Sequence, residues 1–288
     1  MDLFSIKNIT DILSRHGFRF SKSLGQNFLT DRSVCTRIVE FSDVTSDDSV
    51  LEIGPGIGSL TSEIASSAKK VVTVEIDRAL LPVLKETLSE YDNITVINSD
   101  IMKCNLDELI ETEFNGTKPK VCANLPYYIT TPILSFLIES KKFSSITTMI
   151  QKEVAERICA LPGTSEYGAF SVYAQYYTEP ELLFTVSANC FIPQPKVQSA
   201  VVIFRMREKP AVTPKSESLF FRVVKASFAQ RRKQLANSLH SAFKAEFSKE
   251  AILSTITSAG HKPTVRGEEL SIEDFCKLSD MFYDIMNK

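Results

Sequence analysis

The sequence of 288 residues lacks the features of membrane and exported proteins. No uninterrupted apolar run is long enough to span a bilayer, so we expect no membrane partner. Residues 1–11 include Asp2 and contain no basic region followed by an apolar block, so we expect no signal peptide. Together these absences predict a cytoplasmic protein.

Residues that bind metals or form disulfides are also few. The six cysteines are scattered with no close pair, which predicts reduced thiols and excludes the spacing of a zinc site. The three histidines, His16, His240 and His261, lie far apart in the sequence. We therefore expect no bound metal ion.

Charge is nearly balanced over the chain but unevenly distributed. The net charge of −2 by itself argues against a nucleic-acid partner, but no acidic residue lies between Glu217 and Glu246. This interval predicts a surface for nucleic-acid phosphates, and a solvated helix face is the alternative. Its basic residues are Arg222, Lys225, Arg231, Arg232, Lys233 and Lys244.

Short apolar runs alternate with helical patterns along the first two thirds of the chain. Seven such runs predict a doubly wound α/β sheet with an added antiparallel edge. The predicted strands are residues 49–53, 70–74, 94–97, 120–123, 145–150, 182–186 and 200–206.

The end of the chain has a different pattern. Residues 209–215 are rich in proline and charge and predict a linker. Apolar spacing beyond it predicts a helix pair over 218–243 and helices over 249–259 and 272–286. We therefore expect two domains, residues 1–208 and a small all-helical domain, residues 209–288.

A glycine-rich loop, Glu52-Ile53-Gly54-Pro55-Gly56-Ile57-Gly58, follows the first predicted strand and precedes a helix. This arrangement is typical of sites that hold a nucleotide-like ligand, because glycine lets the backbone approach it closely. A carboxylate at Glu52 repels phosphate and attracts a cationic ligand. The alternative for Glu52 is a surface or capping role.

Acidic residues follow the next two strands. Glu75 stands about 20 residues beyond the glycine loop, where an acid binds a ribose diol, and Asp77 is placed to cap the following helix. Asp31 is placed in the same way to cap the helix that follows it. Asp100, next to Ile101, is suited to an adenine amino group, and a turn aspartate is the alternative.

Asn124-Leu125-Pro126-Tyr127 follows a fourth buried strand. An amide oxygen and a loop carbonyl can accept both hydrogens of an exocyclic amine, and a tyrosine ring can stack on the base. A plain strand-terminating turn is the alternative. Phe191 precedes a proline-stiffened turn that is placed to present the ring at a loop tip, although a lone Phe is more often a core residue.

These motifs, in this order and spacing, resemble the ribosomal RNA adenine dimethyltransferase family. The resemblance covers about residues 20–282 and includes Leu-Gly-Gln-Asn-Phe-Leu at 24–29 and the tail segments 228–233 and 267–271. It implies a Rossmann-like, seven-stranded S-adenosylmethionine-dependent methyltransferase sheet with a small helical C-terminal domain. The first domain is then catalytic, and the second binds RNA.

The resemblance also implies roles for single residues. S-adenosylmethionine is the implied methyl donor, and the target is the N6 amino group of two adjacent adenosines in 16S ribosomal RNA of the small subunit. The protein would act as a monomer. The implied donor-binding residues are Asn27, Leu29, Gly54, Glu75, Asp100 and Asn124, the catalytic residues are Asn124, Leu125, Tyr127 and Phe191, and the RNA-binding residues are Arg222, Lys225, Arg231, Arg232 and Lys233.

Three other functions compete with this interpretation. A nicotinamide-dependent oxidoreductase explains Glu75 but leaves Asn124–Tyr127 without a role. A non-catalytic ribosome-assembly factor on the same fold would not need the intact motifs. A resistance methylase of large-subunit RNA tends to be strongly basic with a shorter tail, unlike this chain.

Overall fold

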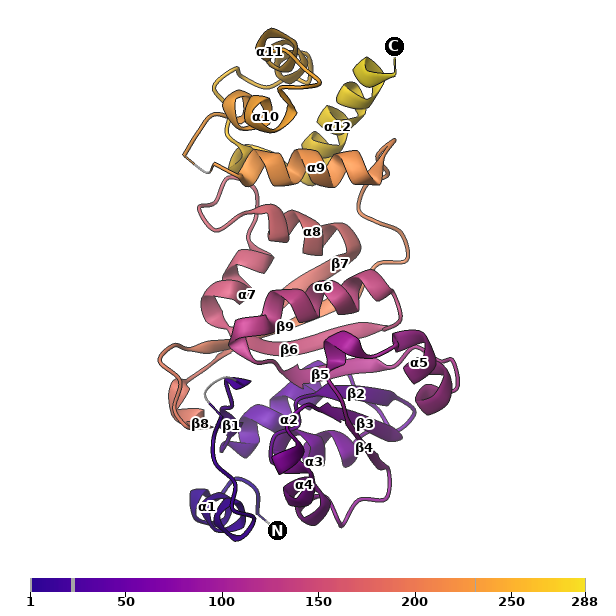
Figure 1. Cartoon of the computed structure of the whole chain (residues 1–288), viewed down its shortest axis with the longest axis vertical. Helices are drawn as coiled ribbons and strands as arrows, with labels where there is room; N and C mark the ends of the chain where they lie inside the picture. The colour runs from indigo at the N-terminus through magenta and orange to yellow at the C-terminus, as the bar shows by residue number, and fades with distance from the viewer. Residues whose placement is uncertain (1, 22–23, 231, 288) are drawn as a thin grey trace. The chain divides into compact units, whose positions relative to one another are not determined.

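A seven-stranded sheet organises the first part of the chain (Figure 1). The computed structural model describes residues 2–21, 24–230 and 232–287. The strand order is β4-β3-β2-β5-β6-β9-β7. Each strand coincides with a predicted run, which confirms the α/β class: β2 (Ser49–Ile53), β3 (Lys70–Glu75), β4 (Ile94–Asn98), β5 (Lys120–Asn124), β6 (Ser145–Gln151), β7 (Thr178–Val186) and β9 (Ser199–Met206).

Parallel strands bring their carboxyl ends together at one edge of the sheet. Strands β2 to β6 run parallel, and β9 pairs antiparallel with β6, as predicted for the added edge. In the register, Ile53 of β2 lies beside Val74 of β3 and Ala123 of β5. The residues that follow these three positions therefore gather at the carboxyl ends of neighbouring strands, where α/β sheets bind ligands.

Helices cover the sheet, and this accounts for its apolar strands. In β2, every residue from Val50 to Ile53 is buried, as expected for a strand packed on both faces. One core cluster joins α2 and α3 to residues of β2, β3, β5 and β6. The helices along this part of the chain are α1 (Ile6–Arg15), α2 (Arg32–Phe41), α3 (Ser59–Ala65), α4 (Leu81–Thr87), α5 (Leu106–Phe114), α6 (Thr130–Ser140) and α7 (Lys152–Cys159).

Two helix starts confirm predicted caps. Asp31 precedes α2, and its side chain accepts a hydrogen bond from Ser33 N. Asp77 precedes the short helix η2 (Arg78–Leu80) and accepts from Ala79 N. An N-cap carboxylate satisfies an amide that has no partner within the helix, and here the cap of η2 also fixes the chain just beyond β3.

A small second sheet was not predicted. β1 (Phe28–Leu29) pairs antiparallel with β8 (Phe191–Ile192), and Leu29 lies opposite Phe191. Thr30 N also donates to Cys190 O at 2.8 Å. This pairing joins two segments that are more than 160 residues apart in the sequence.

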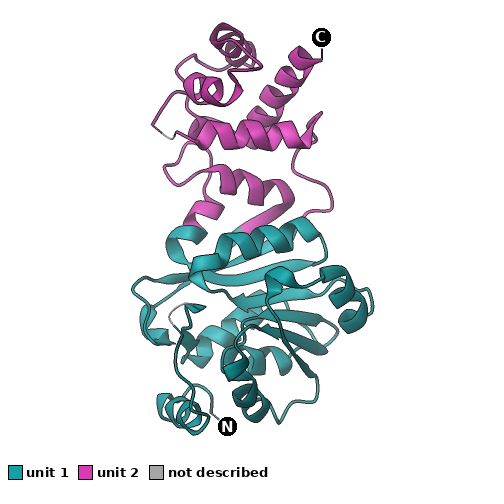
Figure 2. Cartoon of the chain, viewed as in Figure 1, with its two compact units in different colours: residues 1–155, 181–206 teal, residues 156–180, 207–288 magenta. Residues whose placement is uncertain are grey.

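The chain divides into two compact units, residues 1–155 with 181–206 and residues 156–180 with 207–288 (Figure 2). The second unit begins its C-terminal part within two residues of the predicted boundary. It also contains residues 156–180, which lie within the predicted first domain, residues 1–208. The reason is aromatic packing within the unit: Tyr176 contacts Phe220 at 5.1 Å between ring centroids, and the hydroxyls of Tyr176 and Tyr177 both donate to Glu217.

The second unit is helical, as predicted. Gly267 lies so close to α9 that a Cβ atom there would be 2.8 Å from Ser227 O, which explains why the tail motif has glycine at this position. Among the described residues, no helix is long and apolar enough to cross a membrane. The helices of this unit are α8 (Ala169–Tyr177), α9 (Glu217–Phe228), α10 (Leu235–Phe243), α11 (Lys249–Ser258) and α12 (Ile272–Met286).

Candidate active site

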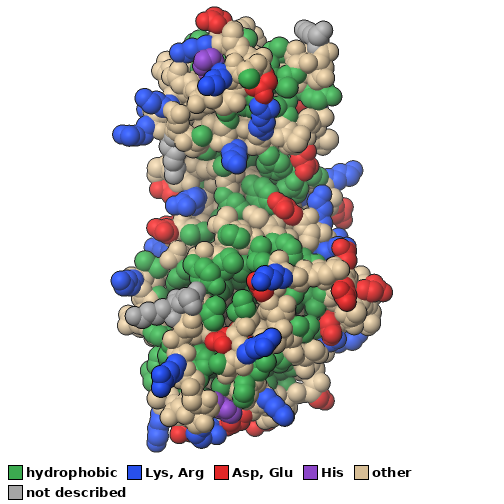
Figure 3. All heavy atoms as spheres, viewed as in Figure 1, with side chains coloured by type: hydrophobic (Ala, Val, Ile, Leu, Met, Phe, Trp, Pro, Cys, Tyr) green, Lys and Arg blue, Asp and Glu red, His purple; other side chains and the backbone are tan. Residues whose placement is uncertain are grey.

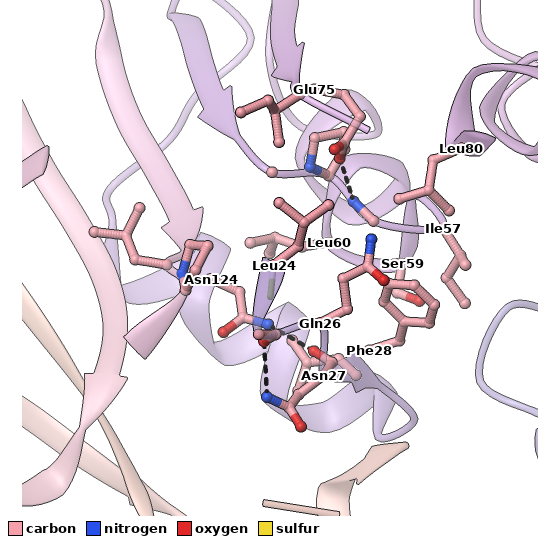
Figure 4. A pocket seen from close by; sticks show the side chains of 18 of the residues that line it. Leu24, Gln26, Asn27, Phe28, Ile57, Ser59, Leu60, Glu75, Leu80 and Asn124 are labelled. Atoms are coloured by element: carbon pink, nitrogen blue, oxygen red, sulfur yellow. Dashed lines mark hydrogen bonds between the residues drawn. The ribbon is translucent and has the colours of Figure 1, made fainter. Parts of the chain in front are cut away.

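A pocket of about 770 Å³, open at its mouth, lies at the carboxyl ends of β2, β3 and β5. Figure 4 shows side chains from distant parts of the sequence on its walls. The lining residues are 24–29 of the N-terminal segment, Glu52, 54–57, Ser59 and Leu60 around the glycine loop, Glu75, Ile76 and Leu80, and residues 124–128.

The glycine loop opens onto this pocket. Gly54 has a positive φ of 68°, and a Cβ atom placed there would meet nothing within 4 Å. Gly56 also has a positive φ, and a Cβ there would lie 2.9 Å from Cδ1 of Phe28. Gly54 therefore leaves open space for a ligand, whereas Gly56 lets the Phe28 ring close over the loop.

Glu52 is a buried carboxylate in the pocket wall. It is 1% exposed, and its Oε2 atom has no hydrogen-bond partner among the described residues. Burial raises the pKa of Glu52 to about 8, because an ionised carboxylate is disfavoured away from water. A buried acceptor without a partner is costly, so this atom is suited to a cationic group of a ligand. Such a group would also favour the ionised form.

Glu75, at the end of β3, is the second buried carboxylate of the pocket. Burial raises its pKa to about 7, while hydrogen bonds from Asp77 N at 2.7 Å and Gly56 N at 3.4 Å favour the charged form. Asp77 in turn accepts a hydrogen bond from Gln26 Nε2 at 2.7 Å. The N-terminal segment is thus fastened beside the predicted ribose site.

Asn124 ends β5 with its amide orientation fixed. Its Nδ2 atom donates to Asn27 O at 3.1 Å. A main-chain carbonyl can only accept, so the nitrogen of the amide must face Asn27 and the Oδ1 atom must face elsewhere. No described residue donates to Oδ1, which leaves this oxygen able to accept a hydrogen bond from a ligand amine.

Hydrogen bonds to β6 and β9 hold the rest of the loop after Asn124. Leu125 is buried, and its N–H donates to Met149 O at 3.1 Å. The Tyr127 hydroxyl and the Ser199 hydroxyl lie 2.6 Å apart in a hydrogen bond. Burial raises the pKa of Tyr127, so the phenol stays neutral. Tyr128, by contrast, is 59% exposed at the pocket.

The structure brings most of the predicted site residues together and leaves two out. Asp100 does not line the pocket; its carboxylate accepts from Met102 N at 3.0 Å and so caps a short helix. Phe191 was expected at a loop tip, and that expectation is wrong, because Phe191 is 5% exposed and belongs to the same core cluster as Leu29, its partner in the β1–β8 pair. The residues that do line the pocket are Asn27, Leu29, Gly54, Glu75, Asn124, Leu125 and Tyr127.

Several pocket contacts were missed by sequence reasoning. Gln26 belongs to the motif at 24–29, but its hydrogen-bond partner Asp77 lies 51 positions away. Ser199 was given no role at the site, yet its hydroxyl is hydrogen-bonded to that of Tyr127. Ile76 lines the pocket and is 48% exposed, a position that its apolar character beside Glu75 could have suggested.

The basic segment of the second unit is only partly free to bind phosphates. Arg222 forms an ion pair with Glu246, and its guanidinium lies 4.4 Å from the centre of the Phe243 ring. Lys225, Arg232 and Lys233 are exposed, and Arg231 lies outside the described residues. On the face seen in Figure 3, Lys and Arg side chains of this unit stand among acidic ones.

No group of three His, Cys, Asp or Glu side chains in the described part of the chain could hold a metal ion. The donor set fits a different ligand. A buried carboxylate oxygen without a partner, a second carboxylate at the end of β3 and the open space at Gly54 suit S-adenosylmethionine, which carries a cationic sulfur, an ammonium group and a ribose. Fold and pocket together define an S-adenosylmethionine-dependent methyltransferase.

Comparison of the sequence with known protein families and proteins narrows this class of methyltransferase. A sequence profile described as ribosomal RNA adenine dimethylase matches residues 17–284, and the chain belongs to that family. It is 49% identical to "Ribosomal RNA small subunit methyltransferase A" of Shouchella clausii, over 96% of this chain and 94% of that protein. The protein of the same name from Clostridium botulinum is 48% identical, over 97% of this chain and 100% of that protein.

Two solved structures show the same fold over most of the chain. A dimethyladenosine transferase from Plasmodium falciparum superposes with a TM-score of 0.72 at 26% identity, covering 90% of this chain and 98% of that one. The 23S ribosomal RNA methyltransferase ErmE superposes with a TM-score of 0.68 at 26% identity, covering 91% and 100%. The predicted family, fold and enzyme class are therefore confirmed.

Proposed function

We propose that this protein transfers methyl groups from S-adenosylmethionine to the N6 amino groups of two adjacent adenosines in 16S ribosomal RNA of the small subunit. The observation that carries the proposal is the Asn124 amide, whose Oδ1 atom is left without a donor in the pocket wall. The names of the relatives at 48–49% identity support the small subunit as substrate.

The first step is to hold the donor. When bound, S-adenosylmethionine supplies a methyl carbon made electrophilic by its positively charged sulfur. Glu52 would face its cationic groups, and Glu75 would accept hydrogen bonds from its ribose hydroxyls. Asn27 and Leu29 would cover it from the N-terminal segment. A contact between Asp100 and the adenine of the donor stays a prediction, because Asp100 does not line the pocket.

The second step is to prepare the acceptor. The lone pair of N6 is delocalised into the adenine ring, so the amine is a poor nucleophile. Hydrogen bonds from N6 to Asn124 Oδ1 and to the Leu125 carbonyl would favour a pyramidal nitrogen and direct its lone pair at the methyl group. Tyr127, held by Ser199, would stack on the base. Rate acceleration would come from positioning and electrostatics rather than from a strong base.

The predicted stacking of Phe191 on the same base needs a change of conformation. The ring is 5% exposed and would have to leave the core to reach a ligand. In the conformation described here, Phe191 supports Leu29 from across the β1–β8 pair. Its direct contact with the base stays a prediction.

The large-subunit methylase remains the nearest alternative. The similarity to ErmE shows that the fold alone does not choose between the two ribosomal RNAs. Higher identity to the small-subunit relatives, 48–49% against 26%, favours the small subunit. RNA binding by the second unit, a monomeric state and a cytoplasmic location also stay predictions.

The test is methylation of small ribosomal subunits from cells that lack this protein. Labelled methyl groups should enter their RNA as dimethyladenosine at two adjacent positions. An Asn124→Ala variant should lose at least about 100-fold in rate, because N6 loses its positioning oxygen. Binding of the donor should fall much less, because Glu52 and Glu75 would still hold it. Asn8→Ala, on α1 and away from the pocket, is the control. Methyl transfer by Asn124→Ala at the wild-type rate would exclude the mechanism.

A further inference from the structure

Two consecutive tyrosines, Tyr127 and Tyr128, line the pocket, but they differ in burial and in hydrogen bonding. Tyr127 is half-buried and anchored through its hydroxyl to Ser199. Tyr128 is 59% exposed, and its hydroxyl has no hydrogen-bond partner among the described residues. The Tyr128 ring lies against the backbone of Gly25, where a Cβ atom would be only 3.3 Å from Cδ1 of the ring. The Tyr128 ring therefore packs against Gly25 and leaves more than half of the residue accessible to solvent.

A large exposed ring at the mouth of a pocket for a base suggests a second stacking position. To enter the pocket, the target adenosine must leave its stack, so the nucleotide beside it loses a stacking partner. An aromatic side chain next to the pocket can replace that partner with little regard to sequence, since every base has a π face. The chain offers such a ring one residue beyond the one that holds the target.

We propose that Tyr128 is the stacking platform for the nucleotide that adjoins the target adenosine. The proposal rests on the proposed function, since it assigns a neighbour to the base in the pocket. Tyr127 would serve the base inside and Tyr128 the base outside. In a substrate with two adjacent targets, the second adenosine would rest on Tyr128 while the first is methylated.

The surroundings of Tyr128 favour an RNA base over other occupants. The ring belongs to the pocket wall, so a base on it would be continuous with the one in the pocket. The donor side is served by other residues, the buried Glu52 and Glu75. A ribosomal protein surface is the competing occupant, and the second experiment below separates it from a base.

The first experiment measures steady-state methylation of small ribosomal subunits from cells that lack this protein. Tyr128→Ala should raise KM for the subunits about tenfold while binding of S-adenosylmethionine, measured by calorimetry, stays unchanged. Tyr128→Phe keeps the ring face and should stay within about twofold of wild type. Phe41→Ala, which removes an exposed ring that does not line the pocket, is the control. A Tyr128→Leu variant with wild-type KM would overturn the proposal, since contact area would then suffice without an aromatic face.

The second experiment detects the stack directly. A short RNA with the target sequence carries 2-aminopurine, whose fluorescence is quenched by stacking, beside the target adenosine. Wild type and Tyr128→Phe should quench it, and Tyr128→Ala should leave it bright. Equal quenching by all three proteins would overturn the proposal and favour a protein partner for this ring. If wild type transfers no methyl group to the subunits, the proposed function fails instead, and this outcome is distinct from a change confined to Tyr128 variants.

Discussion

Glu52 allows a direct test of the pocket without RNA. Its buried carboxylate should lower the unfolding free energy of the ligand-free protein, and this effect can be measured. The carboxylate is 1% exposed, and burial raises its pKa to about 8 from an ordinary value of 4.5. Replacement by glutamine keeps the shape and removes the titration. The prediction is that Glu52→Gln stabilises the ligand-free protein at high pH and weakens its binding of S-adenosylmethionine.

The sign follows from proton binding. Between pH 4.5 and 8 the folded protein keeps the Glu52 proton that the unfolded chain has lost, so the free energy of unfolding falls as pH rises. Each pKa unit corresponds to 1.36 kcal/mol, so a rise from 4.5 to about 8 amounts to about 5 kcal/mol. This cost is absent below pH 4.5 and complete above pH 8. Glu75 adds a cost of the same sign in wild type and variant alike.

The assay is urea unfolding of wild type and Glu52→Gln from pH 5 to pH 9. The difference in unfolding free energy should be small at pH 5 and should grow toward about 5 kcal/mol in favour of the variant at pH 9. Glu40→Gln, which removes an exposed carboxylate on α2, should show no such trend. A difference that stays constant with pH would refute the claim that Glu52 is a buried acid held ready for a cation.

The same unfolding assay, repeated with S-adenosylmethionine, measures how much the bound donor stabilises wild type and Glu52→Gln. A ligand at 100 times its Kd stabilises wild type by about 2.7 kcal/mol. Glu52→Gln should lose much of this stabilisation, because a neutral amide cannot replace a carboxylate beside a positive sulfur or ammonium group. Full stabilisation of the variant by S-adenosylmethionine would mean that Glu52 faces something else.

Three further changes test the remaining contacts. Gly56→Ala should weaken donor binding at least tenfold in calorimetry, because its Cβ would displace the Phe28 ring and strain a positive φ; unchanged binding would contradict the loop geometry. Ser199→Ala and Tyr127→Phe should each raise KM for RNA a few-fold, and the double variant should add nothing, whereas additive effects would refute their coupling. Arg232→Glu should weaken RNA binding and lower its salt dependence without changing donor binding, and equal loss of both would indicate misfolding.

Most of the fold could be predicted because its signals are local. The seven strands are short apolar runs, and each was found within a few residues of its position in the structure. The caps Asp31 and Asp77 were recognised from one or two neighbouring residues. The two-residue strands β1 and β8 were missed, because a run of two residues has no periodicity and exists only through its partner.

The sequence alone determined which residues form the glycine loop, the two acidic strand ends and Asn124–Tyr127, since each motif is contiguous and follows a buried strand. Tertiary structure alone decided how they work together. The Asn124 amide is oriented by a carbonyl 97 positions away, and Tyr127 is hydrogen-bonded to Ser199, 72 positions away. Phe191 is buried, and Asp100 lies outside the pocket. Hydrogen bonds and burial between distant segments depend on how the sheet brings strand ends together, and no local pattern of residues contains that information.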